Sequence, residues 1–279
     1  GTLFPLIAGA LALGKFSVGP PYFNLLFVPL TLLLLFFMGI GPATNWKKQS
    51  VDVILLPLRK VLLAAVIIAI ALPLAFFGNW PWQVGLTVGL CAWVFGSQLV
   101  DIARKSQNAS TRIKGLSRLT RSYWGMQLAH LGLLVTVLGV AFTSAYSIEK
   151  DVRLAPGESI TVNGYAFRFD GVQDHQGPNY VAQRGTLEVS HDGFVEVLHP
   201  EKRIYRVQQS PMTEAAITGN TFRDLYVALG EPLDAGAWAV RIYHKPMIRW
   251  IWFGALMMAL GGLLSMLDKR YRLKAAGGR

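Results

Sequence analysis

One apolar run that contains a single histidine constrains this chain more than any other feature of its sequence. Residues 125–145 (GMQLAHLGLLVTVLGVAFTSA) carry no Asp, Glu, Lys or Arg, and their one ionisable side chain is His130. The run is long enough to cross a bilayer, which takes about 20 apolar residues in a helix. An ionisable residue inside such a helix is costly, and it marks a functional site by default. The run therefore predicts a membrane-spanning helix built around His130.

Four further apolar runs predict four further spans. The composition agrees, because 52% of the 279 residues are hydrophobic and they cluster along the chain. Pro73 should kink or end the second span, and Gly19-Pro20-Pro21 should keep the segment before the first span in a loop. Residues 1–24 are expected to form a short extracytoplasmic or interfacial segment. The five predicted spans cover residues 25–40, 61–77, 83–100, 125–145 and 247–267.

The distribution of charge predicts how these spans cross the membrane. The connections 41–60 and 101–124 and the tail 268–279 hold fifteen Lys and Arg residues and three Asp residues, whereas residues 146–246 hold ten Lys and Arg and thirteen Asp and Glu. Basic segments next to membrane helices are retained in the cytoplasm. All three basic segments fall on the cytoplasmic side if residues 146–246 are periplasmic. The net charge of +11 is therefore juxtamembrane and does not indicate a nucleic-acid partner.

The polar segment 146–246 has the pattern of a β domain. Apolar and polar residues alternate on both sides of Asn163-Gly164, which is typical of a tight hairpin. A second hairpin is expected at Asp192-Gly193, between Leu187 and Val189 on one side and Val195 and Val197 on the other. Trp238, Val240 and Ile242 alternate in a later strand. The sequence thus predicts an α-helical polytopic membrane protein with a small extracytoplasmic β domain, a sandwich or open barrel, inserted between the last two transmembrane helices.

His130 has two interpretations when its residue type alone is considered. It can be a polar residue bonded to a neighbouring helix, or it can be a metal or haem ligand. Gly125, Gly132 and Gly139 mark one face of the helix for close packing, and His130 lies on another face, which it shares with Tyr123, Gln127, Leu134 and Val137. His130 should lie about 7–8 Å past Gly125 along the helix axis, in the inner part of the membrane. It should be about 20 Å from His244 across a bilayer core of about 30 Å. These two residues are therefore not expected to share an iron atom.

The remaining candidate residues have less specific patterns. His175, His191, His199 and His244 match no zinc spacing and are interpreted as surface or turn residues, their roles left open. Cys91 is the only cysteine, so the chain has no CxxC motif and no internal disulfide. Lys245 and Arg249 are expected to be interfacial anchors, or else contacts to an anionic group such as a haem propionate. Glu149, Lys150, Asp151 and Arg153 are expected to form a solvated edge. No nucleotide-binding or hydrolase motif is present, and no catalytic residue is identified.

Several stretches resemble the cytochrome c-type biogenesis family CcmF, in its C-terminal part. They lie at the start, the middle and the end of the chain, so the resemblance covers essentially its whole length. The matching stretches are TLFPL (2–6), SVGPPYFN (17–24), RSYWGMQLAHLG (121–132) and KPMIRWIW (245–252).

This resemblance implies a component of a haem lyase in the bacterial inner membrane, which serves cytochrome c maturation by system I. Such proteins receive haem from the chaperone CcmE and deliver it to apocytochrome c, which CcmH or CcmI presents. The family also holds a b-type haem between two transmembrane histidines, with quinol as the electron source. His130 matches the second of these histidines. The other axial ligand belongs to the half of the family's sequence that is absent here, so the chain alone is expected to be a piece without activity.

Two other classes of protein remain as alternatives. The chain could be half of a transporter or permease with an extracytoplasmic domain. It could also be a structural docking module of the assembly complex.

Overall fold

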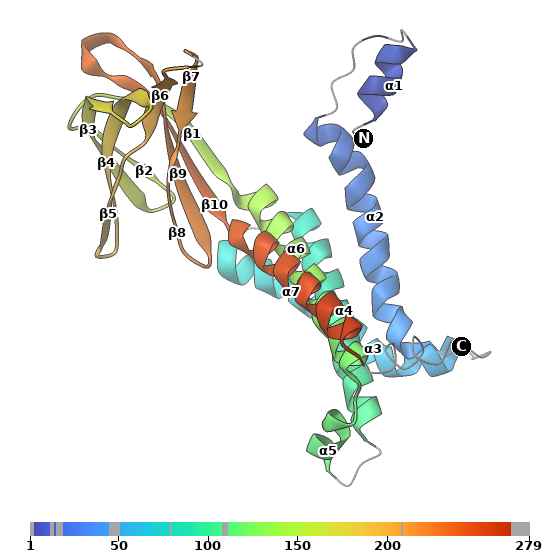
Figure 1. The fold of residues 1–279 in the computed structure, drawn as a ribbon. Helices are drawn as coiled ribbons and strands as arrows, with labels where there is room; N and C mark the ends of the chain where they lie inside the picture. Colours follow the sequence, from blue (N-terminus) through green and yellow to red (C-terminus); the bar gives the residue numbers. More distant parts are fainter. Residues whose placement is uncertain are drawn as a thin grey trace. The chain divides into compact units, whose positions relative to one another are not determined.

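The computed structural model describes residues 3–11, 14, 19–44, 51–78, 80–107, 111–207 and 209–268. The chain divides into two compact units, residues 1–134 with 257–279 and residues 135–256 (Figure 1). The first unit is helical. Its elements are α1 (Phe4–Ala10), α2 (Pro20–Ile40), the short 3-10 helix η1 (Gly41–Ala43), α3 (Val51–Phe77), α4 (Trp82–Ser106), α5 (Arg112–Ser117), the first half of α6 (Arg121–Tyr146) and the second half of α7 (Ile248–Met266).

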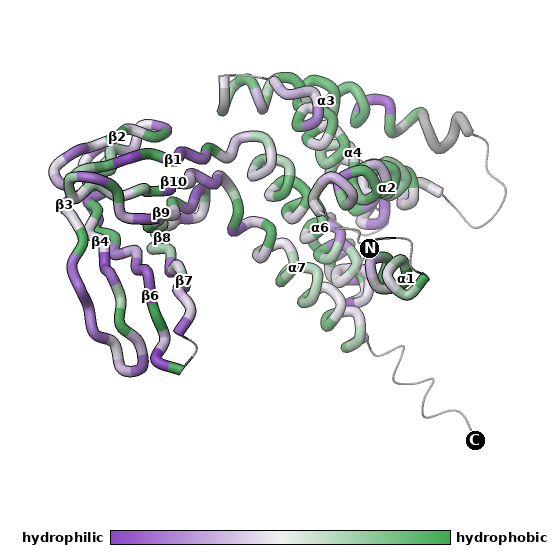
Figure 2. The backbone as a smooth tube through the Cα atoms, turned by 90° about the horizontal axis from the view of Figure 1, so that it is seen from above, coloured by the Kyte–Doolittle hydropathy of each residue, from purple (hydrophilic) through white to green (hydrophobic). Residues whose placement is uncertain are grey.

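Five of the described helices are long and apolar enough to cross a membrane, and they confirm the five predicted spans. They are α2, α3, α4, α6 and α7, with membrane-capable segments at Pro21–Ile40, Leu58–Phe76, Trp82–Ser106, Arg121–Tyr146 and Ile248–Met266. Figure 2 shows hydrophobic residues dominating α2 and α3, whereas hydrophobic and hydrophilic residues mix along the strands.

The helices extend beyond the boundaries that the sequence predicted. α2 begins at Pro20, inside the predicted loop, because proline suits the first turn of a helix, where no backbone N–H donor is required. α3 continues to Phe77, so Pro73 does not end it. Neighbouring helices and local adjustments make proline tolerable inside membrane helices. α4 continues through Asp101 to Ser106, which places that aspartate in a helix rather than in the predicted connection.

Small residues let the helices of the first unit approach closely. A Cβ atom added at Gly89 of α4 would lie 3.0 Å from the Cβ atom of Ala69 in α3. α2 is joined to α4 by the indole N–H of Trp93, which donates to the Phe36 carbonyl oxygen at 3.1 Å. Such contacts replace the hydrophobic driving force, which is absent between helices in lipid.

The packing face predicted for α6 is confirmed where it meets α7. A Cβ atom at Gly261 would lie 2.5 Å from the Gly125 carbonyl oxygen and 2.7 Å from the Ala129 backbone nitrogen. The Ser122 backbone N–H also donates to Asp268 Oδ2 at 2.8 Å. The two backbones are therefore in direct contact, and no side chain fits between them at these positions.

The second unit contains a β-sandwich, which confirms the predicted β domain. One sheet has four strands in the order β1-β10-β9-β8, and the other has six, in the order β2-β3-β4-β6-β7 with β5 paired to β4. The first sheet consists of β1 (Ile148–Leu154), β8 (Ala216–Gly219), β9 (Arg223–Pro232) and β10 (Trp238–Pro246), and the short 3-10 helix η2 (Asp234–Gly236) links the last two. The second consists of β2 (Ser159–Val162), β3 (Tyr165–Gln176), β4 (Tyr180–His191), β5 (Phe194–Leu198), β6 (Glu201–Tyr205) and β7 (Pro211–Glu214).

The predicted hairpin at Asn163-Gly164 is present, and its side chains alternate as predicted. Both turn residues have positive φ angles, 49° and 82°, which suits a tight two-residue turn between twisted strands. Phe167 and Phe169 are fully buried, whereas Arg168 between them is exposed. Together with residues of both sheets they form one hydrophobic core: Leu154, Val162, Leu187, Val189, Leu198, Leu225, Val227, Leu229, Trp238, Val240 and Ile242.

The second predicted hairpin is present, but the valines of its outer strand do not contribute to the core. Val195 and Val197 are 61% and 47% exposed, and Leu198 is buried instead. Residues paired directly across an antiparallel ladder share a face. Buried Leu187 pairs with Leu198, whereas Val195 pairs with Ser190 and so lies on the outer face.

The two ends of the sandwich meet beside the membrane helices. β1, which follows α6, pairs with β10, which precedes α7, with Ile148 opposite His244. Thr143 Oγ1 donates to the Pro246 carbonyl oxygen at 2.7 Å. About 100 residues can therefore be inserted between two antiparallel helices, because the insert returns to its starting point.

Candidate functional site

A buried carboxyl group joins α4 to α6. The side chain of Asp101 is 6% exposed. Its Oδ2 atom accepts hydrogen bonds from the Tyr123 hydroxyl at 2.7 Å, from Lys105 Nζ at 3.0 Å and from Gln127 Nε2 at 3.4 Å. Charged groups inside membrane proteins pair with one another or with polar partners, as this one does.

The face of α6 that carries His130 is the face that meets α4. Tyr123 and Gln127 contact Asp101 at one end of this interface, and farther along Cys91 Sγ lies 4.0 Å from the Leu134 carbonyl oxygen. Because the α4 numbers fall as the α6 numbers rise, the two helices are antiparallel. His130 lies between these contacts, one turn from Gln127 and one turn from Leu134.

Three buried polar atoms at this interface have no hydrogen-bond partner among the described residues. They are Gln98 Nε2, Gln127 Oε1 and His130 Nδ1, which comprise a donor, an acceptor and an imidazole nitrogen that can be either. Buried polar groups are normally paired, and each exception requires an explanation, such as a ligand or a water molecule. The interface can therefore hold a polar or metal-containing group at His130.

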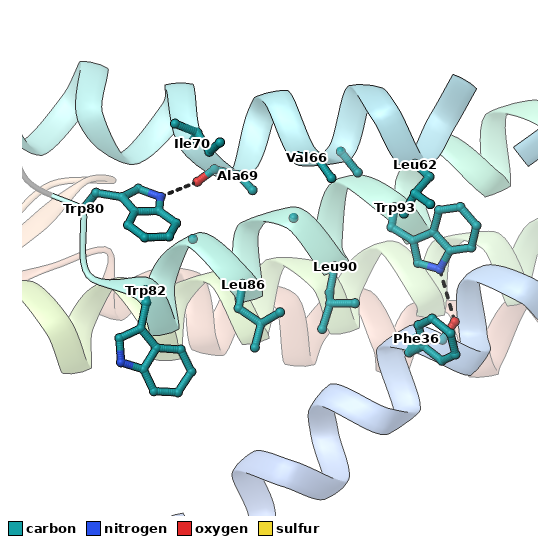
Figure 3. Close-up of a pocket in the computed structure, with 13 residues that line it drawn as sticks. Phe36, Leu62, Val66, Ala69, Ile70, Trp80, Trp82, Leu86, Leu90 and Trp93 are labelled. Atoms are coloured by element: carbon teal, nitrogen blue, oxygen red, sulfur yellow. Dashed lines mark hydrogen bonds between the residues drawn. The ribbon is translucent and has the colours of Figure 1, made fainter. Parts of the chain in front are cut away.

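A separate groove of about 450 Å³ lies among α2, α3 and α4 (Figure 3). Its lining is apolar and includes Leu62, Leu86 and Leu90. Two indole N–H groups beside it are already used, since Trp80 donates to the Ala69 carbonyl oxygen at 2.9 Å and Trp93 donates to Phe36 (Figure 3). This lining suits hydrocarbon and provides no acid, base or metal ligand.

The histidines of the β unit have local partners. His191 Nδ1 lies 2.9 Å from the Gly164 carbonyl oxygen, and His199 Nδ1 lies 3.4 Å from the Gly185 carbonyl oxygen. The ring of His175 lies 6.5 Å from that of Tyr180. Within the part of the chain that the structure describes, no group of three or more His, Cys, Asp and Glu residues could hold a metal ion.

The surface interpretation of His244 is wrong, because this residue is buried. Its Nε2 atom lies 3.0 Å from Asn163 Nδ2, and its ring centroid lies 6.1 Å from that of Tyr165. Burial is the larger cause that lowers the pKa of His244, and the positive charge of Arg223 adds to it.

The cations at the start of α7 are paired within the protein. Arg249 Nε donates to Asp224 Oδ1 at 2.7 Å, and Lys245 Nζ lies 4.9 Å from the ring centroid of Tyr243. At the predicted solvated edge on β1, Asp151 is exposed and accepts a hydrogen bond from Arg241 at 2.8 Å.

The sequence prediction does not include the α4 side of the site. It places Asp101 in a connection and assigns no role to Gln98. A signal was nevertheless present, since the two residues are three positions apart, and residues at that spacing share one face of a helix. Gln98 already lies in the predicted third span, and one further turn places Asp101 on the same face, which also carries Cys91 and Val94.

The fold and this site together define a multi-pass membrane protein with a β-sandwich inserted before its last span and a histidine in a polar helix interface. The family model described as "CcmF C-terminal beta-sandwich" matches residues 145–246. The chain is 50% identical over 275 residues to the cytochrome c-type biogenesis protein CcmF of Pseudomonas fluorescens, a match that covers 98% of this chain and 41% of that protein. It is 42% identical over 277 residues to CcmF of Escherichia coli, covering 99% and 42%.

More distant relatives agree with this result. The chain is 31% identical over 273 residues to the cytochrome c-type biogenesis protein NrfE of Haemophilus influenzae, covering 97% of this chain and 41% of that protein. A solved structure titled "Cytochrome c Heme Lyase CcmF" matches with a TM-score of 0.75 over 96% of this chain and 42% of that chain; at 23% identity, that match supports the fold alone. The chain therefore matches the C-terminal part of the CcmF family, and it spans about two fifths of the length of these relatives.

Proposed function

We propose that the chain is the C-terminal part of a haem lyase component for cytochrome c maturation, and that His130 is an axial ligand of a b-type haem. One observation carries the proposal: a buried imidazole nitrogen without a hydrogen-bond partner in a membrane-spanning helix of a chain that matches the CcmF family. A neutral imidazole is a common axial ligand of haem iron. The unpaired ring nitrogen fits this role better than the alternative role of His130 as a contact to a neighbouring helix, which would give it a partner.

The other axial ligand would come from outside this chain. The four remaining histidines lie on β3, on β4, just after β5 and on β10, outside the membrane spans, and each contacts a neighbour there. A haem held between two histidines is six-coordinate and supplies one-electron transfer. In this proposal quinol provides the electrons that reduce incoming haem.

In this proposal the residues around His130 orient its imidazole ring. When one ring nitrogen of a histidine binds a metal, the other carries the proton and needs an acceptor, and such a partner fixes the orientation of the ring. Gln127 Oε1 is an unpaired acceptor on the same helix face, one turn before His130. Asp101 Oδ2 in turn accepts a hydrogen bond from Nε2 of the same Gln127 amide.

Partners and membrane orientation form part of the same proposal. With the basic connections in the cytoplasm, the β-sandwich is periplasmic and the membrane is the bacterial inner membrane. The sandwich then lies where a CcmE-type haem chaperone, apocytochrome c and CcmH- or CcmI-type proteins would meet it. A reporter placed after Tyr146 should be active only in the periplasm, and activity only in the cytoplasm would reverse this orientation.

The test of the ligand role is His130→Ala in the full-length protein. The low-spin haem spectrum should be lost or should become five-coordinate, and cytochrome c maturation should fall. Membrane insertion should persist, because removing a polar group favours partition into lipid. His199→Ala is the matched control and should keep the spectrum. If His130→Ala keeps both the low-spin spectrum and normal maturation, the role of His130 as a ligand is wrong.

The docking alternative is separable from the haem site. The sandwich has its own core, and its two ends are paired, so it can be removed as a unit. Deletion of residues 146–246 that retains the haem but abolishes apocytochrome recruitment would assign the docking role to the sandwich. Loss of both functions would leave the two roles coupled.

A further inference from the structure

The turn between β8 and β9 presents an aromatic side chain to the outside of the protein. Asn220 Oδ1 accepts hydrogen bonds from the backbone N–H groups of Phe222 at 2.9 Å and Arg223 at 3.0 Å, which closes the turn. The Phe222 side chain is 61% exposed, although it belongs to a turn that is well ordered by these bonds. A large apolar side chain held out in this way requires an explanation.

The same turn is fixed to the first residues of α7. The Met247 backbone N–H donates to the Phe222 carbonyl oxygen at 2.7 Å, and the Trp250 indole N–H donates to the Thr221 carbonyl oxygen at 2.9 Å. The ion pair between Asp224 of β9 and Arg249 of α7 lies beside these bonds. The turn is therefore level with the first helical turn of α7.

The length of α7 sets where that level lies in the membrane. α7 has 19 residues, which at 1.5 Å per residue span about 28 Å. The hydrocarbon core of a bilayer is about 30 Å thick. Nearly the whole helix is needed to cross it, so the first turn of α7 cannot rise far above the boundary between hydrocarbon and headgroups. Phe222 must lie at that boundary as well.

The chemistry of the neighbouring side chains fits this boundary. The rings of Phe222 and Trp250 are 6.4 Å apart, and Trp252, two residues further on, is 72% exposed. Lys245 and Arg249 stand at the same level. Tryptophan side chains are enriched at the membrane–water interface, and phenylalanine side chains of interfacial segments pack into the same layer.

We infer that the β8–β9 turn, residues 220–222, inserts into the interfacial layer of the bilayer, with Phe222 packed among the lipids. The partner of this surface is the lipid bilayer that α7 enters. The insertion adds a second membrane contact to the sandwich beyond its two helices and holds it at a fixed height. The opposite end of β9, near Leu233, is directed away from the bilayer and remains accessible to protein partners.

Site-directed spin labelling of the full-length protein in lipid nanodiscs tests this inference. Nitroxides are attached at Phe222→Cys, or at Thr221→Cys, whose side chain makes none of the backbone bonds that fix the turn. Cys91 and other cysteines are replaced beforehand. Leu233→Cys is the matched control, since Leu233 is also an exposed turn residue, at 44%, and follows the other end of β9, about 36 Å away at 3.3 Å per residue.

The measured quantity is the accessibility of each label to oxygen, which partitions into lipid, relative to a nickel chelate, which stays in water. The ratio should be several-fold higher at position 222 or 221 than at position 233. Equal ratios at the two ends of β9 would overturn the inference, because the turn would then be in water. The result does not depend on haem, so it is independent of the proposed function.

Discussion

The Tyr123 hydroxyl of α6 donates a hydrogen bond to the Asp101 carboxyl group of α4 at 2.7 Å, between two helices that are each able to span a membrane. The contact places the Asp101 carboxyl group of α4 against the α6 face that carries the Tyr123 hydroxyl, the Gln127 amide and His130. Polar groups in this position have little water with which to exchange, so their mutual hydrogen bonds determine how α4 and α6 align.

The first prediction concerns the three donors that share Asp101 Oδ2. Asp101→Ala removes the acceptor and leaves the amide Nε2 of buried Gln127 without it, at a cost of about 1–3 kcal/mol. Asp101→Asn keeps one acceptor oxygen and should cost less. Tyr123→Phe should cost only about 0.6 kcal/mol, the average for interhelical hydrogen bonds in membranes.

Unfolding of the full-length protein in mixed micelles measures these differences. A double-mutant cycle with Tyr123→Phe and Asp101→Ala isolates the pairwise term. If Asp101→Ala proves as stable as the wild type, the network does not hold α4 against α6.

The second prediction uses two adjacent glycines of α7. A Cβ atom at Gly261 would lie 2.5 Å from a backbone oxygen of α6, whereas one at Gly262 would meet nothing within 4 Å among the described residues. Overpacking of a close contact typically costs about 1–3 kcal/mol. Gly261→Ala should therefore lower the free energy of unfolding by that amount, and Gly262→Ala should not lower it. Equal effects at the two positions would refute the α6–α7 contact.

The sequence predicts the spans and the sandwich because their signals are local. Apolar runs of sufficient length have few alternatives to membrane helices, and Asn163-Gly164 determines a hairpin through positive φ angles that only a few residue types adopt readily. The face of His130 and the packing face of Gly125 both follow from helical periodicity.

What the sequence could not predict depends on long-range pairing. His244 continues the alternation of Trp238, Val240 and Ile242 and so shares their buried face, but no local pattern indicates its distant partners Asn163 and Tyr165. Similarly, Val195 and Leu198 differ in burial only because of their partners in β4. The role of Asp101 depended on the end of α4, and helix ends are the least reliable part of a sequence-based prediction.

The third prediction concerns pH and His244. Burial, with a further contribution from Arg223, lowers the pKa of His244 below its ordinary value, which is about 6.5 in an unfolded chain. Between the folded-state pKa and about 6.5 the unfolded chain therefore binds more protons than the folded protein. Stability rises with pH wherever the unfolded state binds more protons, so the β-sandwich should lose stability as the pH falls below about 6.5.

Unfolding of the sandwich at about pH 8 and about pH 5.5 measures this effect. His244→Gln retains a partner for Asn163 but cannot bind a proton, and it should show a smaller loss of stability on acidification than the wild type. His199→Gln, at an exposed position, should behave like the wild type. The same pH dependence in His244→Gln and the wild type would exclude His244 as its source.

The fourth prediction concerns Gln127 and rests on the proposed function. A hydrogen-bond acceptor on the distal ring nitrogen makes a metal-bound imidazole more basic and thereby favours the oxidised metal. Gln127→Leu removes that acceptor, so the midpoint potential of the b-type haem should rise while the low-spin spectrum persists. Gln127→Glu provides a stronger acceptor and should lower the potential. Gln83→Leu, at the exposed start of α4, is the matched control and should leave the potential unchanged. Potentials that stay the same in both Gln127 variants would show that Gln127 does not act on His130, and loss of the haem in Gln127→Leu alone would instead assign it a structural role.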